Sequence, residues 1–190
     1  PAVSGSPSAA GSHEITYAGG EGDKGTLAFD SASGELKWSA PAGADSYSSP
    51  QLTTLAGEQS VLMLTNLGMN ILDPNTGAMR FEYEWKHRGY RALQPQLVGD
   101  SSLILPTGVG TGTRRITVSK SNDSYQAEEN WTSTKLKPDF NDFVIFEDHL
   151  YGFDGAILTC LDLEKGERQW KGGRYGKGQV MLLKESGLLL

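Results

Sequence analysis

Cysteine is nearly absent from the chain, which has one, Cys160, in 190 residues. A single cysteine excludes a disulfide within the chain and any metal site built from several thiolates. The three histidines, His13, His87 and His149, do not have the spacing of a zinc site. Long apolar runs are lacking as well, and none reaches the roughly 18 residues that a membrane-spanning helix needs. We therefore expect no membrane span.

An excess of positive charge is also missing, because 17 Lys and Arg face 23 Asp and Glu, for a net charge of −6. Such a chain lacks the basic footprint of a protein that binds nucleic acid or an anionic membrane. Hydrophobic residues make up 37% and charged residues 21%, which excludes a fully disordered chain and a coiled coil. The sequence also lacks the Gly-x-Ser-x-Gly elbow of serine hydrolases. Nucleic acid is therefore not an expected partner.

What the chain does contain is an internal repeat with a period of about 44 residues. Three copies have an Asp, a Gly four positions later and an aromatic residue eight positions later. They are Asp30, Gly34 and Trp38; Asp73, Gly77 and Phe81; and Asp162, Gly166 and Trp170. A degenerate copy has Ser119 in the Asp position, lacks the Gly and ends at Trp131. Prolines 7, 50 and 95 precede the first three copies at a similar spacing, so the repeat is unlikely to arise by chance.

Each repeat is interpreted as four short strands. In the fourth copy these are residues 143–146, 149–153, 157–161 and 167–170, and in the second copy 51–54, 60–64, 69–72 and 78–83. No window shows the sustained periodicity of a helix. Repeated four-stranded units with one aromatic residue each are typical of a β-propeller. We therefore predict an all-β fold, a propeller of four-stranded antiparallel blades.

The repeated residues have a structural interpretation. An Asp can accept hydrogen bonds from backbone N–H groups just downstream, and a Gly can adopt a positive φ at no steric cost. The aromatic ring can pack between neighbouring sheets, and an indole N–H can bind a backbone carbonyl there. Asp30, Asp73 and Asp162 are therefore interpreted as turn residues rather than as catalytic acids or calcium ligands. Cys160 lies in an apolar strand and is interpreted as a small buried side chain.

The pattern Leu-Asp-x-x-x-Gly-x-x-x-Trp, with Phe in place of Leu in the first copy, resembles the repeats of pyrroloquinoline-quinone (PQQ)-type propellers. It stands at residues 29–38 and 161–170. That family includes quinoprotein alcohol dehydrogenases, and also non-enzymatic relatives such as the propeller lipoprotein of outer-membrane assembly and bacterial PQQ-like proteins. The segments 149–155 and 158–162 are most similar to the last group. The resemblance covers essentially the whole chain and is specific for the fold, but it says little about function.

Three functions are compatible with this resemblance. The first is a non-catalytic binding or protein-interaction scaffold in a bacterial periplasmic or other extracytoplasmic compartment, which implies no cofactor. The second is a fragment of a PQQ-dependent alcohol or sugar dehydrogenase, which implies PQQ and Ca²⁺. The single Cys160 excludes, within this chain, the adjacent cysteine pair found in many such enzymes. The third is an interaction module attached to a larger enzyme or signalling chain.

Polar segments lead into the first strand of each blade, and the resemblance implies that they end near the channel of the propeller. Together these segments place Tyr, Arg, Asn, Asp and Lys around one opening, which is typical of a binding site for a protein or a small molecule. The candidate ligand-binding residues are Tyr47, Arg88, Arg91, Asn141, Asp142 and Lys177. Arg and Lys there suit an anionic group or a peptide carboxylate. The alternative is an ordinary solvated rim.

The repeat also divides the chain into blades. The expected bounds are residues 4–40, 47–85, 92–133 and 140–171, with an incomplete fifth blade at 178–190. Related propellers usually have seven or eight blades, so we expect part of a ring. Its open edges would need missing blades or another chain to cover them. A small propeller closed by this chain alone is the alternative.

Overall fold

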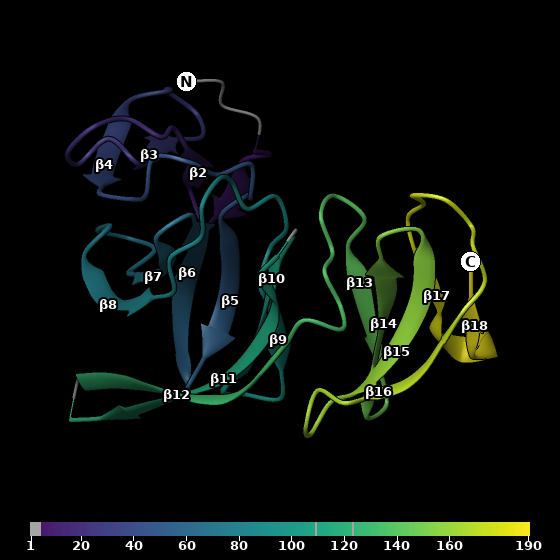
Figure 1. The fold of residues 1–190 in the computed structure, drawn as a ribbon. Helices are drawn as coiled ribbons and strands as arrows, with labels where there is room; N and C mark the ends of the chain where they lie inside the picture. Colours follow the sequence, from purple (N-terminus) through teal and green to yellow (C-terminus); the bar gives the residue numbers. More distant parts are fainter. Residues whose placement is uncertain (1–4, 109, 123) are drawn as a thin grey trace. The chain divides into compact units, whose positions relative to one another are not determined.

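The computed structural model describes residues 5–108, 110–122 and 124–190, and these residues form mainly β-strands (Figure 1). The expected start of the first blade, at residue 4, lies outside the described residues. The chain divides into two compact units. The N-terminal unit comprises residues 1–103 and 117–128, and the C-terminal unit comprises residues 104–116 and 129–190.

Four sheets follow one another along the chain, and each contains four strands in chain order. This arrangement confirms the prediction of a propeller built from four-stranded blades. The first is β1 (Ser8–Ala10), β2 (His13–Tyr17), β3 (Thr26–Asp30) and β4 (Leu36–Ala40); the second is β5 (Gln51–Leu55), β6 (Glu58–Thr65), β7 (Gly68–Leu72) and β8 (Met79–Glu84). The third is β9 (Gln96–Val98), β10 (Ser102–Thr107), β11 (Gly112–Ser121) and β12 (Ser124–Ser133); the fourth is β13 (Phe143–Phe146), β14 (His149–Asp154), β15 (Ile157–Asp162) and β16 (Arg168–Gly172).

Two further short strands follow the fourth blade, where the sequence predicts the start of a fifth. They are β17 (Leu182–Leu183) and β18 (Leu188–Leu189), which pair with each other and are joined by the 3₁₀ turn η1 (Lys184–Ser186). Within the described parts of the chain, no helix is long and apolar enough to cross a membrane.

The Asp-x-x-x-Gly segments form the predicted turns between the third and fourth strands of their blades. In the second blade, Asp73 Oδ1 accepts hydrogen bonds from the backbone N–H groups of Asn75 and Thr76, both at 2.9 Å. The N–H of Gly77 donates to the carbonyl of Asp73 at 2.9 Å, and Gly77 has a φ of +71°. Burial alone would raise the pKa of Asp73, but these bonds and one from Arg80 lower it.

The other two turns repeat this geometry. All three also share a shift in the strand-pairing register that the sequence does not predict. The glycines of the first and fourth blades, Gly34 and Gly166, have φ values of +73° and +67°. In all three blades the pairing register between the third and fourth strands shifts just before the Asp. These shifts, which are β-bulges or similar irregularities, lie at residues 28/29, 71/72 and 160/161. A bulge bends the strand and sharpens its twist there.

A tryptophan of one blade packs on the turn of the next blade inside each unit. In the N-terminal unit, Trp38 is 7% exposed, and its indole N–H donates to the carbonyl of Pro74 at 3.1 Å. A Cβ added to Gly77 would lie 2.4 Å from Cε3 of Trp38. Only a glycine therefore lets the indole approach the turn this closely.

The C-terminal unit contains the same contact between the third and fourth blades. Trp131 is 8% exposed and donates from its indole N–H to the carbonyl of Leu163 at 3.0 Å. A Cβ on Gly166 would lie 2.6 Å from Cε3 of Trp131. We call this arrangement, with an indole stacked on a glycine and bonded to the carbonyl after the Asp, the tryptophan lock.

Trp170 does not form such a lock. Its side chain is 44% exposed, and the nearest aromatic ring is that of Tyr151, with centroids 6.1 Å apart. The sequence-based expectation of a buried plate between blades is therefore wrong for Trp170. The physical reason is that no Asp-x-x-x-Gly turn among the described residues packs on its ring.

The third blade departs from the repeat at its turn. Ser119, which occupies the Asp position in the sequence, lies within β11, because β11 continues to Ser121. In the N-terminal unit, Tyr125 on β12 stacks against Phe81 with ring centroids 6.5 Å apart. The hydroxyl of Tyr125 donates to Glu58 at 2.6 Å. Side-chain bonds, rather than a glycine turn, therefore join the second and third blades here.

Candidate functional site

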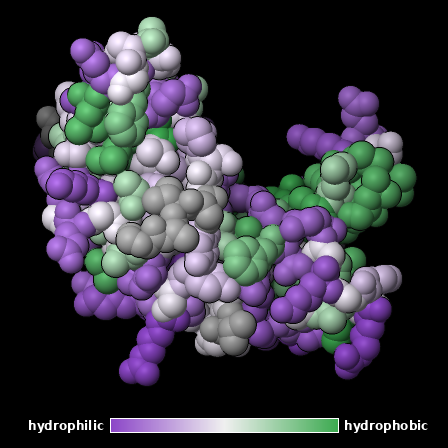
Figure 2. Space-filling model, turned by 90° about the horizontal axis from the view of Figure 1, so that it is seen from above, coloured by the Kyte–Doolittle hydropathy of each residue, from purple (hydrophilic) through white to green (hydrophobic). Residues whose placement is uncertain are grey.

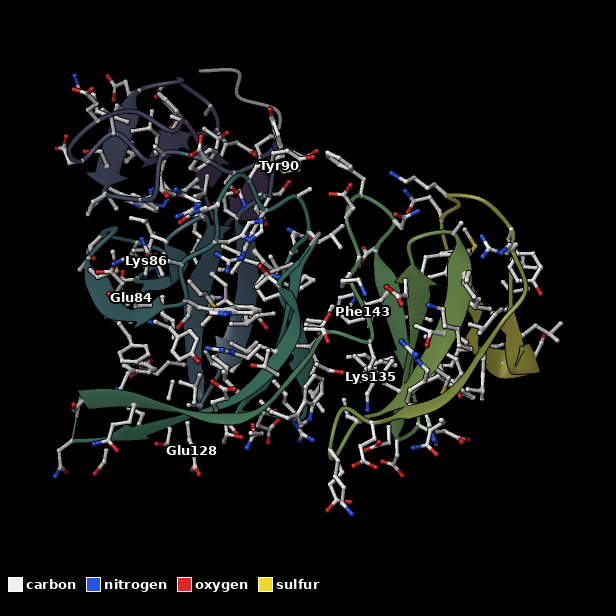
Figure 3. The ribbon with its side chains drawn as sticks, in the orientation of Figure 1. Glu84, Lys86, Tyr90, Glu128, Lys135 and Phe143 are labelled. Carbon is white, nitrogen blue, oxygen red and sulfur yellow. The ribbon has the colours of Figure 1, made fainter. Side chains whose placement is uncertain are left out.

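Two of the predicted site residues of the N-terminal unit meet at the segments before β5 and β9. The backbone N–H of Tyr47 donates to the carbonyl of Arg91 at 2.8 Å. The ring of Tyr47 lies edge-on to that of Tyr90, with centroids 4.8 Å apart. Tyr90 is 39% exposed and is labelled in Figure 3. Arg88 is exposed nearby in sequence. Lys86 pairs with Glu84 at 2.8 Å, and this pairing raises the pKa of Lys86 (Figure 3).

Arg91 has a structural role in this unit. Its side chain is 1% exposed, and its guanidinium donates to the backbone carbonyls of Thr65 and Trp85. The guanidinium carbon also lies 4.7 Å from the centroid of the Trp85 ring. A buried cation needs such partners, because an unpaired charge there would be costly. Arg91 is therefore not presented to a ligand from solvent.

The other predicted residues belong to the C-terminal unit, where they surround the start of β13. Asn141 is 9% exposed and donates from its amide to the carbonyl of Gly178 at 2.6 Å. Asp142 has a φ of +59°, and its carboxylate accepts the N–H of Phe143 at 2.8 Å (Phe143 is labelled in Figure 3). Asp142 thus fixes the first residue of β13, while Asn141 ties this segment to the one that carries Lys177.

Asn141 and Lys177 line a hollow of about 240 Å³ in this unit, and we call it the lysine hollow. Asp142 is not part of its lining. The lining residues are Lys137, Asp139, Asn141, Asp154, Gly155, Lys171 and Lys177. They come from the segment before β13, from the end of β14 and the turn after it, from β16 and from the segment after β16. The structure therefore joins two of the six predicted residues in one place.

The centre of the lysine hollow is Asp154, whose side chain is only 8% exposed. Its carboxylate is 2.5 Å from the ammonium of Lys137, 2.7 Å from that of Lys171 and 3.4 Å from the guanidinium of Arg168. Burial by itself would raise the pKa of Asp154, but the two lysines outweigh it and lower the pKa. One ionised carboxylate therefore faces three cations.

Lys137, Lys171 and Asp154 belong to this site but are not among the residues predicted from the sequence. In the sequence, Asp154-Gly155 is a pair typical of a hairpin turn. Lys171 follows Trp170, the aromatic residue of the fourth repeat, and no pattern marks it as a site residue. The strand register brings them together, because Asp154 pairs with Ile157 at the start of β15 and Lys171 pairs with Thr159 two residues on. Knowing that register would have placed Lys171 close to the turn.

A second feature of the C-terminal unit is apolar. Figure 2 shows a hydrophobic patch, in green, on the side where Figure 1 draws β17 and β18. Phe153 and Leu158 of the fourth blade line a groove of about 390 Å³ with residues near the C-terminus, including Leu189. The exposed apolar side chains of this region are Trp170, Tyr175, Met181, Leu183, Leu188 and Leu190. Apolar side chains of the fourth blade and of the C-terminal residues are therefore exposed in this unit.

The carboxylates of the repeat are engaged within their own turns. Asp30, Asp73 and Asp162 each accept backbone N–H groups within their own turns. Among the described residues, no group of three or more His, Cys, Asp or Glu side chains could hold a metal ion.

A family model matches most of this repeated chain. The sequence model of the PQQ_2 family, described as outer membrane protein assembly factor BamB, matches residues 2–172. A search of curated proteins found no match. Among solved structures, the computationally designed protein Ika8 is similar with a TM-score of 0.61 and 10% identity, over 96% of this chain and 56% of Ika8. BamB from Moraxella catarrhalis has a TM-score of 0.45 and 16% identity, over 92% of this chain and 62% of BamB.

The chain thus spans less than two thirds of the length of either solved protein. The structural likeness to Ika8 concerns the fold alone, and the family assignment rests on the sequence match over residues 2–172. The chain belongs to the PQQ_2 family of β-propellers, which is the family of the outer membrane protein assembly factor BamB.

Proposed function

We propose that the chain is a non-catalytic propeller scaffold that binds a partner protein in an extracytoplasmic, periplasmic compartment of a bacterium. Its family is that of the outer membrane protein assembly factor BamB, which supports a role in protein assembly. Fold alone does not fix function, so the proposal depends on a site in this chain. That site is the lysine hollow of the C-terminal unit.

The observation that carries the proposal is the charge of this hollow. Lys137, Lys171 and Lys177 line it, and Arg168 reaches the carboxylate of Asp154. Among the described residues of the lining, the acidic side chains that oppose them are Asp139 and Asp154. The excess of positive charge lies on segments held by the strands of the fourth blade. Such segments on a rigid scaffold are common binding sites. In a chain with a net charge of −6, a local cationic site favours a specific anionic partner.

We further propose that the chain works without PQQ or Ca²⁺. The support is that the acidic residues of the repeat accept backbone N–H groups in their own turns. Asp30 and Asp162, like Asp73, are ionised turn residues whose pKa is lowered. For Asp30 the main cause is the hydrogen bond from the backbone of Ser33, and for Asp162 the bonds from Lys165 and Glu167 overcome the opposing effect of burial.

Photo-crosslinking tests the binding proposal. The chain is exported to the periplasm of a bacterium with a photoreactive residue in place of Lys177, or in place of Lys37 as the control. Lys37 is a partly exposed lysine of β4 in the N-terminal unit. We expect adducts with an outer-membrane protein or an assembly component, identified by mass spectrometry, at 177 but not at 37. Equal labelling at both positions, or none at either, would contradict the proposal.

A further inference from the structure

Lys177 differs from the other cations of the lysine hollow in its contacts. Lys137 and Lys171 share the carboxylate of Asp154 at 2.5 and 2.7 Å. Lys177 lines the same hollow, is exposed, and pairs with no acidic side chain of the described residues. Its ammonium group is therefore available to an incoming anion without the loss of an existing ion pair.

The segment that carries Lys177 is held in place by hydrogen bonds of the two residues that follow it. The carbonyl of Gly178 accepts the buried amide of Asn141 at 2.6 Å. The side-chain amide of Gln179 donates in turn to the carbonyl of Phe140 at 2.9 Å. Two hydrogen bonds thus tie residues 178 and 179 to the segment before β13. This fixed backbone reduces the entropy lost when Lys177 closes on a ligand.

Asp154 does not cancel the positive charge that surrounds it. Its carboxylate forms ion pairs with Lys137, Lys171 and Arg168. Lys137 also donates a hydrogen bond to the carbonyl of Thr134 at 2.7 Å, and Arg168 donates one to the carbonyl of Lys135 at 3.2 Å (Lys135 is labelled in Figure 3). The lysines are thereby held at the wall of the hollow with an unbalanced charge. A further carboxylate placed between Lys171 and Lys177 would offset part of this excess of positive charge.

Resting on the proposed function, we propose that the lysine hollow binds a side-chain carboxylate of an acidic peptide segment of the partner. At about 240 Å³ it is smaller than the 300–1,000 Å³ or so that is usual for drug-sized ligands, so it suits one or two side chains. A long polyanion is disfavoured because the chain as a whole has a net charge of −6 and repels it. A short acidic segment experiences mainly the charges within about 10 Å.

Calorimetric titration with synthetic peptides tests this proposal. The probe is an acetylated, amidated tetraglutamate peptide, and the matched peptide is tetraglutamine. We expect the glutamate peptide to bind weakly, with a Kd of about 1 mM or somewhat below, and to bind less well as salt is raised from about 50 to 300 mM. Tetraglutamine should not bind. Equal binding of the two peptides would overturn the proposal.

Substitutions locate the binding in the hollow. Lys177→Ala should weaken glutamate binding about three- to fivefold, which is the upper part of the range for an exposed ion pair. Lys165→Ala is the matched control, because Lys165 is an exposed lysine of the Asp162 turn that does not line the hollow. It should leave the affinity unchanged. Equal effects of the two substitutions would show that binding reflects general surface charge and would overturn the proposal.

Titration with inorganic phosphate distinguishes a carboxylate site from a phosphate site. If phosphate binds more tightly than the glutamate peptide and displaces it, the hollow is a phosphate site and the peptide proposal is wrong. The outcome for the proposed function is separate. Crosslinks from position 177 to an assembly component, without glutamate binding, would leave the scaffold function intact and reject only the carboxylate ligand.

Discussion

The tryptophan lock makes a quantitative prediction for Trp131. Its indole is 8% exposed, packs on Gly166 and donates to the carbonyl of Leu163 at 3.0 Å. Replacing it by alanine removes the ring, leaves a cavity and deprives the carbonyl of its donor. Trp170 offers a matched control because it belongs to the same unit, ends the next repeat and is 44% exposed.

The two substitutions should differ clearly in free energy of unfolding. A buried Trp removes about 200 Å² from water, which at about 25 cal/mol/Å² is about 5 kcal/mol before the contribution of the remaining methyl group is subtracted. Adding the lost hydrogen bond of about 1 kcal/mol, we expect Trp131→Ala to cost about 3–5 kcal/mol. Trp170→Ala removes about half as much buried area and leaves no enclosed cavity, so it should cost about 1–2 kcal/mol.

Urea unfolding followed by far-ultraviolet circular dichroism measures both values without relying on tryptophan fluorescence. Trp131→Phe provides a further comparison, since it keeps most of the apolar contact and loses the indole hydrogen bond. Its cost should lie between those of the two alanine variants. A loss below about 1 kcal/mol for Trp131→Ala, or an equal loss for Trp170→Ala, would refute the assignment of the lock.

Two other substitutions test neighbouring parts of the fold. Gly77→Ala should destabilise the chain by about 1–3 kcal/mol more than Gly34→Ala, because both glycines have a positive φ but only at Gly77 would the new Cβ collide with Trp38. Equal urea midpoints would contradict this. Hydrogen bonds from Lys120 and Tyr125 lower the pKa of Glu58 below 4.5, so the stability that it contributes is complete above pH 4.5 and is lost as the pH falls through the lowered pKa. Glu58→Gln should therefore flatten the dependence of the urea midpoint on pH below 4.5. If the urea midpoint of the variant fell with pH as steeply as that of the unsubstituted chain, the contribution of the Glu58 hydrogen bonds would be contradicted.

The turns of the fold could be predicted because their requirements are local. An Asp that bonds the next N–H groups and a Gly with a positive φ stand at fixed spacing in one segment, as at Asp73 and Gly77. Ser119 shows the limit of such reasoning. Without a Gly four residues later, nothing local ends the strand there, and β11 continues to Ser121.

The candidate site was harder to predict because it depends on long-range contacts. Arg91 has the composition of a ligand-binding residue, but its partners are backbone carbonyls, which leave no trace in the sequence. Lys171 reaches Asp154 only through the register of β14, β15 and β16. The role of Trp170 depends in the same way on whether a turn of another blade covers it. Spacing within a repeat cannot reveal such partners.

Hydrogen exchange of the indole N–H groups tests the lock between blades most directly. The indole signals can be assigned by nuclear magnetic resonance with single Trp→Phe variants. The structure predicts slow exchange for Trp38 and Trp131, which are buried and bonded to the carbonyls of Pro74 and Leu163. It predicts fast exchange for the exposed Trp170. Fast exchange at Trp38 and Trp131, or protection of Trp170 equal to theirs, would contradict the central claim that tryptophans locked onto glycine turns join the blades.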